Sequence, residues 1–340
     1  MKYEEVVDSG YKIIEYSEEW HETWDNFVEY SLNGTFLQSR RFLSYHPKDR
    51  FRDSSLIFLD KKNNIVAVCP ACEIYEGERK IFYSHKGSTY GGLVLSDKIY
   101  KAKHLVPLIK LFEEYLQRRD FQQVYLKITP DIFCTCNMSL LEYALYFCGF
   151  NEFKDLNTYI DYTLYKDPVE SNFTQGKRSH INKCIREGMK ASIITTDDEV
   201  REYYDILCEN LIKYDLKPVH TVDELLDFKN SRLQNECQFF GTYLNDEMIA
   251  GGMIFIFKRT KIAHTQYLSA KSKYLKLGSA SFLYYSVIEA IKKQGFEKLS
   301  WGVCTENYGK YLNDGLISSK EDYGSMYSNN LTYFKSLQGK

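Results

Sequence analysis

The sequence has little that would mark it as disordered, membrane-spanning or secreted. Its 340 residues include only 6 Pro and 19 Gly, too few for a disordered chain or a long linker. No apolar run approaches the roughly 18–20 residues that cross a bilayer. Residues 1–5 are largely acidic and lack the apolar stretch of a secretory signal. These absences predict a globular, cytoplasmic protein.

An excess of charge of one sign is also missing. The formal net charge is −2, whereas nucleic-acid-binding domains are usually strongly basic. A near-neutral total still leaves room for a local basic patch. The charge therefore does not require a nucleic-acid partner.

The nine Cys lack the spacing of a zinc site. Cys69 and Cys72 form a C-x-x-C, and Cys134 and Cys136 form a C-x-C, but no second C-x-x-C follows at ligand spacing. A cytosolic chain keeps its thiols reduced. We expect buried structural thiols and no metal.

What the chain does contain is a weak internal repeat. Each copy predicts three antiparallel strands joined by polar turns, then a helix, then a further strand. The first copy has strands at 56–60, 65–75 and 80–85, a helix at 101–116 and a strand at 123–128. The second has strands at 239–244, 247–257 and 261–268, a helix at 279–294 and a strand at 298–303. The length suits two domains, so we expect a duplicated, mixed α/β (α+β) fold.

Other elements are predicted outside the two copies. The boundary is placed near Pro168, which gives domains 1–166 and 167–340. A strand is expected at 158–164, and a strand and a helix at 13–15 and 20–30. Further helices are expected at 138–148, 171–190, 199–214 and 222–233.

Three segments resemble the FemAB-like acyltransferases, a branch of the GNAT superfamily. Residues 173–188 read FTQGKRSHINKCIREG and are similar to the basic helix of that family. Residues 274–280 read YLKLGSA and stand in the place of the GNAT acyl-donor loop. Residues 301–324 read WGVCTENYGKYLNDGLISSKEDYG and resemble the stretch after the family's penultimate strand.

The resemblance implies tandem GNAT-like lobes. It places the acceptor side in residues 1–166, and acyl-donor binding and catalysis in residues 167–340. It also implies acyl-CoA, such as acetyl-CoA, as co-substrate. The donor loop departs from the usual Q/R-x-x-G-x-G/A pattern, which puts the identity of the donor in doubt. The expected donor-binding residues are Lys276, Leu277, Gly278, Ser279 and Ala280.

Direct transfer to an amine needs a base, oxyanion donors and an acid for the leaving group. Glu306 follows a strand directly and is the expected base, and Lys320 the expected oxyanion or phosphate contact. Tyr308 or Tyr323 could protonate the leaving group. For the acceptor we expect Lys86, Tyr90, Lys177, Arg178 and Asn313. Each could instead be structural: a solvated Glu or Lys, a turn Asn, a basic helix face or a tight Gly-rich turn at 85–92.

Three hypotheses about the function follow. The first is an acyl-CoA-dependent N-acyltransferase acting on a small-molecule or nucleotide-linked amine, such as an amino sugar or a cell-surface polymer precursor. The second is an aminoacyl-tRNA-dependent ligase acting on a peptidoglycan precursor, for which tRNA would be the partner. The third is a degenerate acyltransferase module that binds without catalysis.

Overall fold

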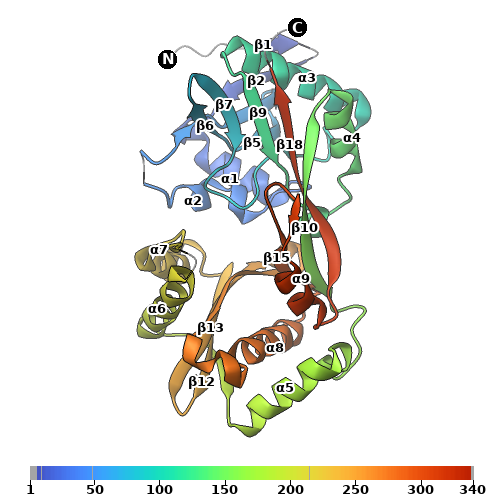
Figure 1. Cartoon of the computed structure of the whole chain (residues 1–340). Coiled ribbons are helices and arrows are strands. Elements are labelled where there is room, and N and C mark those ends of the chain that lie inside the picture. The colour runs from blue at the N-terminus through green and yellow to red at the C-terminus, as the bar shows by residue number, and fades with distance from the viewer. Residues whose placement is uncertain (1–5, 9, 48, 214, 338–340) are drawn as a thin grey trace. The chain divides into compact units, whose positions relative to one another are not determined.

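The computed structural model describes residues 6–8, 10–47, 49–213 and 215–337. The chain divides into two units (Figure 1). The first unit comprises residues 1–155 and 329–340, and the second comprises residues 156–328. Strands β10 (Asn151–Asp161) and β18 (Met326–Ser336) each begin in one unit and end in the other.

The first unit begins with a five-stranded sheet in the order β1-β2-β4-β5-β8. Its successive side chains point to opposite faces, as the strand period requires. Leu56 and Phe58 pack with α3, whereas Ile57 and Leu59 pack with Trp24 of α1. Both faces of this sheet are therefore covered at β4, which explains why Leu56 to Leu59 are all apolar and buried. The elements are β1 (Val6–Asp8), β2 (Tyr11–Glu15), α1 (His21–Tyr30), α2 (Arg40–Leu43), β4 (Leu56–Asp60), β5 (Ile65–Cys69), β8 (Val94–Leu95) and α3 (Ala102–Arg118).

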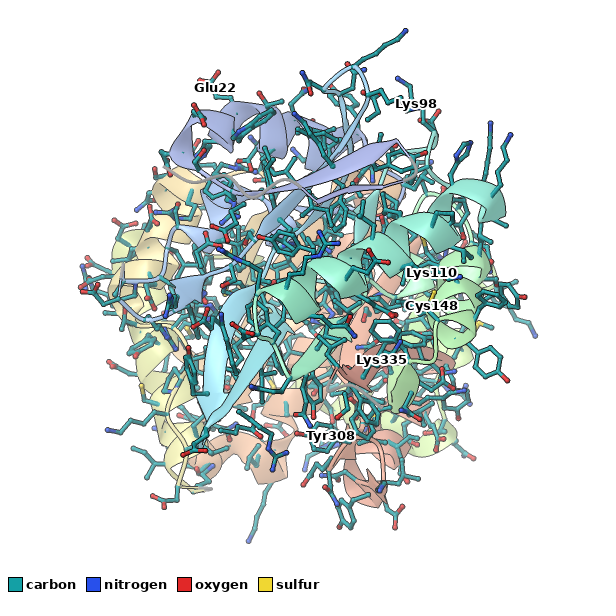
Figure 2. The ribbon with its side chains drawn as sticks, turned by 90° about the horizontal axis from the view of Figure 1, so that it is seen from above. Glu22, Lys98, Lys110, Cys148, Tyr308 and Lys335 are labelled. Atoms are coloured by element: carbon teal, nitrogen blue, oxygen red, sulfur yellow. The ribbon has the colours of Figure 1, made fainter. Side chains whose placement is uncertain are left out.

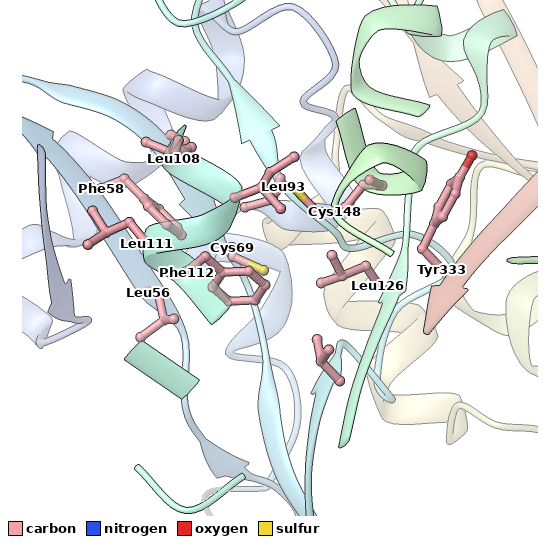
Figure 3. Close-up of a cluster of buried hydrophobic side chains, with 14 of the residues drawn as sticks. Leu56, Phe58, Cys69, Leu93, Leu108, Leu111, Phe112, Leu126, Cys148 and Tyr333 are labelled. Atoms are coloured by element: carbon pink, nitrogen blue, oxygen red, sulfur yellow. The ribbon is translucent and has the colours of Figure 1, made fainter. Parts of the chain in front are cut away.

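The second sheet of the first unit carries the parallel pair predicted by the repeat. Strand β9 (Gln123–Lys127) runs parallel to β7 (Arg79–Ser84) and antiparallel to β18. The hairpin β6 (Cys72–Glu76) and β7, with β3 (Arg52–Asp53), extends this sheet. Helices α3 and α4 (Ser139–Phe147) cover it, and Figure 3 shows Phe112 of α3 between strands of both sheets.

One predicted strand is in fact two. The run 65–75 breaks at Pro70, and its halves β5 and β6 belong to different sheets. Proline has no N–H to give to a ladder. The break lets one apolar run serve two layers of the first unit.

The second unit follows the predicted repeat closely. Its sheet has the order β11-β12-β13-β14-β15-β10, and only the β14–β15 pair is parallel. Helices α5 and α8 share a buried cluster with one side of the sheet, and α6 packs on β13 and β14. The elements are α5 (Gln175–Arg186), β11 (Lys190–Ile193), α6 (Asp197–Ile212), α7 (Val222–Asp227), β12 (Cys237–Leu244), β13 (Glu247–Phe257), β14 (Ile262–Ala270), α8 (Ser279–Lys293), β15 (Lys298–Val303), β16 (Thr305–Glu306), β17 (Tyr311–Leu312) and α9 (Asp314–Glu321).

The division differs from the predicted boundary near Pro168. The units exchange after residues 155 and 328, so the last strand of the chain completes the sheet of the first unit. The predicted helix at 171–190 is also shorter: α5 ends at Arg186, Gly188 has φ +84°, and Lys190 begins β11. A left-handed glycine is a common helix terminator.

Candidate active site

The candidate site of the second unit begins where its two parallel strands separate. Strands β14 and β15 pair only from Ile262–Lys298 to His264–Ser300, although β14 continues to Ala270 and β15 to Val303. A register shift in the β13–β14 ladder falls between Met253 and Ile254, beside this point. Beyond His264 and Ser300, β14 and β15 no longer pair with each other. The backbone groups on their facing edges therefore need other partners.

A chain of buried polar side chains lies at this separation. Nδ1 of His264 lies 3.1 Å from Oγ of Ser300, which donates to Oδ1 of Asn157 at 3.2 Å. Asn157 in turn donates to Oγ of Ser328 at 2.8 Å. Burial, and then the charge of Lys320, lower the pKa of His264 to about 3. The imidazole is therefore neutral at physiological pH.

Lys320 of α9 lies at the end of β15. It is 3% exposed, and its ammonium donates to the carbonyls of Trp301, Gly302 and Val303 at 3.0, 3.1 and 3.3 Å. Sγ of Cys304 is a further contact at 3.3 Å. Burial lowers the pKa of Lys320. Since an ammonium has three protons, a direct contact with an oxyanion would require one of these bonds to break.

The first turn of α8 packs against α5. Gly278 has φ +96°, and a Cβ built there would lie 2.5 Å from Nε2 of His180 and 2.7 Å from Sγ of Cys184. Cys184 also donates to the carbonyl of Leu277 at 3.2 Å. The approach of α5 by itself accounts for the glycine. Gly278 is buried and packs within the unit, and its predicted contact with the donor stays a prediction.

The remaining residues of the predicted donor loop differ in how far their side chains are exposed. Lys276 is exposed at the end of the 3-10 turn η7 (Ser272–Leu277), and Leu277 and Ala280 are half-buried. Oγ of Ser279 is buried and has no hydrogen-bond partner in the described structure. The first amides of any α-helix lack an intrahelical acceptor. An unsatisfied hydroxyl, free amides and a lysine fit a phosphate-bearing donor.

Lys177 lies beside this entrance. Its ammonium is 3.4 Å from Oδ2 of Asp322 and 4.8 Å from the ring of Tyr323. The Tyr323 hydroxyl donates to the carbonyl of Ser281 in the first turn of α8 at 3.3 Å. Lys177 is thus brought to the predicted donor loop, and Tyr323 is buried as a packing partner of α8. Nη1 of Arg178 donates to the carbonyl of Phe173 at 2.8 Å.

Glu306 and Asn313 come together at the N-terminal end of α9. The carboxylate of Glu306 accepts from Nδ2 of Asn313 at 3.2 Å, and Oδ1 of Asn313 caps α9 at the amide of Leu316. Glu306 is exposed in the β16–β17 hairpin. Tyr308, labelled in Figure 2, is 59% exposed in the turn of this hairpin. Asn313 has the structural role of a helix cap, and it also fixes the orientation of Glu306.

The predicted acceptor residues of the first unit lie on the loop that follows β7. Lys86 is exposed, with its ammonium 5.7 Å from the ring of Tyr83. Tyr90 is 1% exposed and packs against Phe133, so it lies in the interior of the unit. The amide of Gly91 donates to the carbonyl of Lys127 at 2.8 Å. This loop therefore closes over the end of the β7–β9 pair.

The structure also addresses the expectations about thiols, metals and membrane spans. All nine Cys are free; Cys69 and Cys72 are buried as predicted, whereas Cys136 is exposed. Across the described ranges, no group of three or more His, Cys, Asp or Glu is placed to hold a metal ion. None of the described helices is both long and apolar enough to cross a membrane.

Sequence reasoning missed the buried chain from His264 to Ser328. The only signal was the presence of polar residues, among them His264 and Ser300, within otherwise apolar strands. Such residues normally indicate a hydrogen-bonded partner in the interior. That signal could show that partners exist, but not which residues they are.

Residues 200–310 match the acetyltransferase (GNAT) family model. The chain is similar to the crystal structure of FemX, with 10% identity and a TM-score of 0.67 over 94% of this chain and 96% of that chain. The chain has a two-lobed, FemAB-like GNAT fold. The L-PGS structure from Bacillus licheniformis is also similar, with 14% identity and a TM-score of 0.59 over 92% of this chain and 90% of that chain. No curated protein matches by sequence.

A tandem GNAT protein from the clavulanic acid biosynthesis pathway is similar over 97% of this chain and 99% of that chain, with 8% identity and a TM-score of 0.58. At such identities the likeness establishes the fold and leaves the substrates open. The predicted fold class is confirmed. The residues matched by the GNAT family model lie entirely in the second unit.

Proposed function

We propose that the second unit of this FemAB-like chain is an N-acyltransferase lobe that binds acyl-CoA and transfers its acyl group to an amine. The observation that carries the proposal is the separation of β14 from β15 after His264 and Ser300. Two facing strand edges without a common ladder offer N–H and C=O groups to an extended ligand that carries amides. The pantetheine arm of coenzyme A is such a ligand.

The phosphate end of the donor would be held at the entrance of α8. Lys276 is exposed there, and the hydroxyl of Ser279 lies unpaired in the first turn. The helix dipole adds a positive potential at this end. With the donor held along β14, its reactive carbonyl would lie toward the polar chain that includes His264 and Ser300.

Glu306 is the proposed base for the attacking amine. It would take the proton that the amine loses as the new C–N bond forms, and Asn313 would hold its carboxylate in place. Tyr308, in the same hairpin, is the proposed proton donor to the leaving thiolate. Lys320 is a positioning residue in this proposal, because its protons are used by the carbonyls at the end of β15.

The proposed acceptor is an amine on a small or nucleotide-linked molecule, such as an amino sugar or a cell-surface polymer precursor. Lys177 and Arg178 are the proposed anion contacts in the second unit; Lys86 of the first unit remains a separate prediction. Arg178 keeps donors beyond its bond to Phe173, and a guanidinium suits phosphate.

Isothermal titration with acetyl-CoA at several temperatures tests donor binding. We expect saturable binding that Lys276→Ala weakens about threefold to tenfold, the effect of losing one partly screened phosphate contact. Lys103→Ala is the matched control, because Lys103 is exposed at the start of α3, the equivalent helix of the first unit. No binding heat at any temperature would contradict the proposal and favour a non-catalytic module.

The exposed cations of α5 favour aminoacyl-tRNA as the alternative donor. Lys183 and Arg186 are exposed on the helix that packs against the entrance of α8. A tRNA donor predicts binding that weakens steeply with salt. Saturable acetyl-CoA binding, without tRNA binding even at low salt, would exclude it.

A further inference from the structure

The first unit contains a hollow that plays no part in the proposed acyl transfer. It has a volume of 560 Å³ and is lined by α4, the start of β10 and Tyr333 of β18. This volume is within the usual range of small-molecule sites. Because all its lining residues belong to the first unit, the hollow can be considered by itself and is called the α4 pocket.

Aromatic rings form one wall of the α4 pocket. Tyr143 and Tyr146 of α4 are 54% and 73% exposed, and Phe150 lies deeper at 5%. Helix α4 thus buries Leu141, Ala144 and Leu145 in the core and presents its rings outward. Ring faces carry negative electrostatic potential and attract cations.

Carboxylates form the other wall. Glu142 and Glu152 line the pocket with one ammonium, that of Lys154, which is 2.8 Å from Oε1 of Glu152. Among the residues the structure describes, Glu142 has no ion-pair partner. Burial, and then the charges of Asp131 and Glu152, raise its pKa. Burial and the same two glutamates raise the pKa of Tyr333.

The nearby cations have other contacts, although the Lys335 ammonium also lies 5.5 Å from the ring of Phe150 at the bottom of the pocket. Lys335 pairs with Glu113 at 2.7 Å and donates to the carbonyl of Cys148, and Lys110 lies 5.7 Å from the ring of Phe147. Figure 2 labels Lys110, Cys148 and Lys335, and Figure 3 shows the Tyr333 hydroxyl pointing away from Leu126. The α4 pocket therefore keeps an excess of negative charge beside aromatic faces.

We propose that the α4 pocket binds a small organic cation, with its ammonium group between the carboxylate of Glu142 and the rings of Tyr143 and Tyr146. An anion would meet the two carboxylates. A neutral ligand would leave Glu142 with only the nearby charge of Lys154 to offset its own. Ser139 and Asn151 add a hydroxyl and an amide for a polar substituent on the ligand. This site does not depend on the acyl-transfer proposal.

Titration of the full chain with choline chloride, followed by calorimetry, tests this site. The neutral isostere 3,3-dimethylbutan-1-ol and sodium chloride at equal ionic strength are the comparison titrants. We expect saturable choline binding, and binding of the isostere that is weaker by about tenfold. Equal binding of the isostere would show an apolar pocket and overturn the proposal. So would the absence of saturable binding by both choline and spermidine.

Variants locate the cation within the pocket. Glu142→Gln and Tyr146→Ala should each weaken choline binding by about fivefold to tenfold. Tyr146→Phe should retain it, which separates loss of the ring from loss of the fold. Glu22→Gln and Tyr30→Ala are matched controls on α1, where both residues are exposed. Controls that weaken binding as much as the pocket variants would contradict the assignment.

Discussion

The two units share one order of elements but end their parallel strand pairs differently. In the first unit, β7 and β9 remain paired to Ser84 and Leu126, and the following loop bonds to both strands through Gly91 and Gly92. In the second unit, β14 and β15 separate after His264 and Ser300. The repeat thus contains one parallel pair whose end is bonded to a loop, in the first unit, and one whose strands separate, in the second.

The comparison also concerns the backbone carbonyls at the end of the last strand. In the first unit a backbone amide, that of Gly91, satisfies the carbonyl of Lys127 at the end of β9. In the second unit the Lys320 ammonium satisfies three carbonyls at the end of β15. In the second unit no β14–β15 pairing continues past this point. This difference assigns the proposed donor site to the second unit.

The largest expected effect comes from removing Lys320. Lys320→Met keeps much of the volume but leaves three carbonyls without their donor, at a cost of about 3–5 kcal/mol in the free energy of unfolding. Urea unfolding followed by fluorescence and circular dichroism measures it. Lys310→Met, at an exposed position, is the control. A loss no larger than that of the control would show that Lys320 does not hold the end of β15.

Glu306→Gln should act on the reaction and not on the fold. The side chain is exposed, so the free energy of unfolding should change by less than about 0.5 kcal/mol. Loss of a general base should lower kcat about 100-fold. The measurement is acyl transfer to a panel of amines by mass spectrometry, with Glu187→Gln as the control. Unchanged turnover would remove Glu306 from the proposed mechanism.

Gly278→Ala should weaken the junction of α5 and α8. The new Cβ would meet His180 and Cys184, and the backbone is left-handed, so we expect a loss of about 2 kcal/mol in unfolding free energy. Gly176→Ala in α5, with nothing within 4 Å of its Cβ, should instead be neutral or stabilising by up to about 1 kcal/mol. Equal effects of the two substitutions would mean that α5 does not pack on Gly278.

Acid should destabilise both units, and the first unit more. Burial lowers the pKa of His264 to about 3, and those of His46 and His85 in the first unit to about 4. The unfolded chain takes up these protons below about pH 6.5, so the stability present above that pH is lost as pH falls toward the folded values. From pH 7.5 to 5.5 His264 alone should cost about 1.4 kcal/mol.

Unfolding curves at pH 7.5 and 5.5 check this prediction. His264→Gln should remove its share of the pH dependence. His46→Gln with His85→Gln should remove a larger share if the first unit is the more acid-sensitive one. A pH dependence unchanged by either set would contradict the buried, neutral imidazoles.

Much of the fold could be predicted because the sequence encodes it locally. Polar turns between apolar runs correctly predicted the hairpin β12–β13, and Gly295 (φ +81°) follows α8 as expected for a helix end. The splitting of β5 from β6 could also have been inferred from Pro70 alone. These signals act over a few residues and need no knowledge of the tertiary structure.

The candidate site was less predictable, because its contacts join residues far apart in the sequence. The bond from Ser300 to Asn157 and the contact of Gly278 with His180 depend on which strands and helices become neighbours. The resemblance to FemAB-like proteins identified Lys320 and Glu306 but not their surroundings. Their predicted catalytic roles remain predictions.

The passage of β10 and β18 between the units has a consequence for synthesis of the chain. Strand β18 pairs with β9 through Thr332–Lys127 to Ser336–Gln123, so the first unit needs residues that are made only after the whole second unit. Its sheet cannot be completed before residues 156–328 of the second unit have been synthesised. We expect that a chain stopped at residue 155 exposes the edge of β9, and that a single cut in the chain cannot release either unit intact.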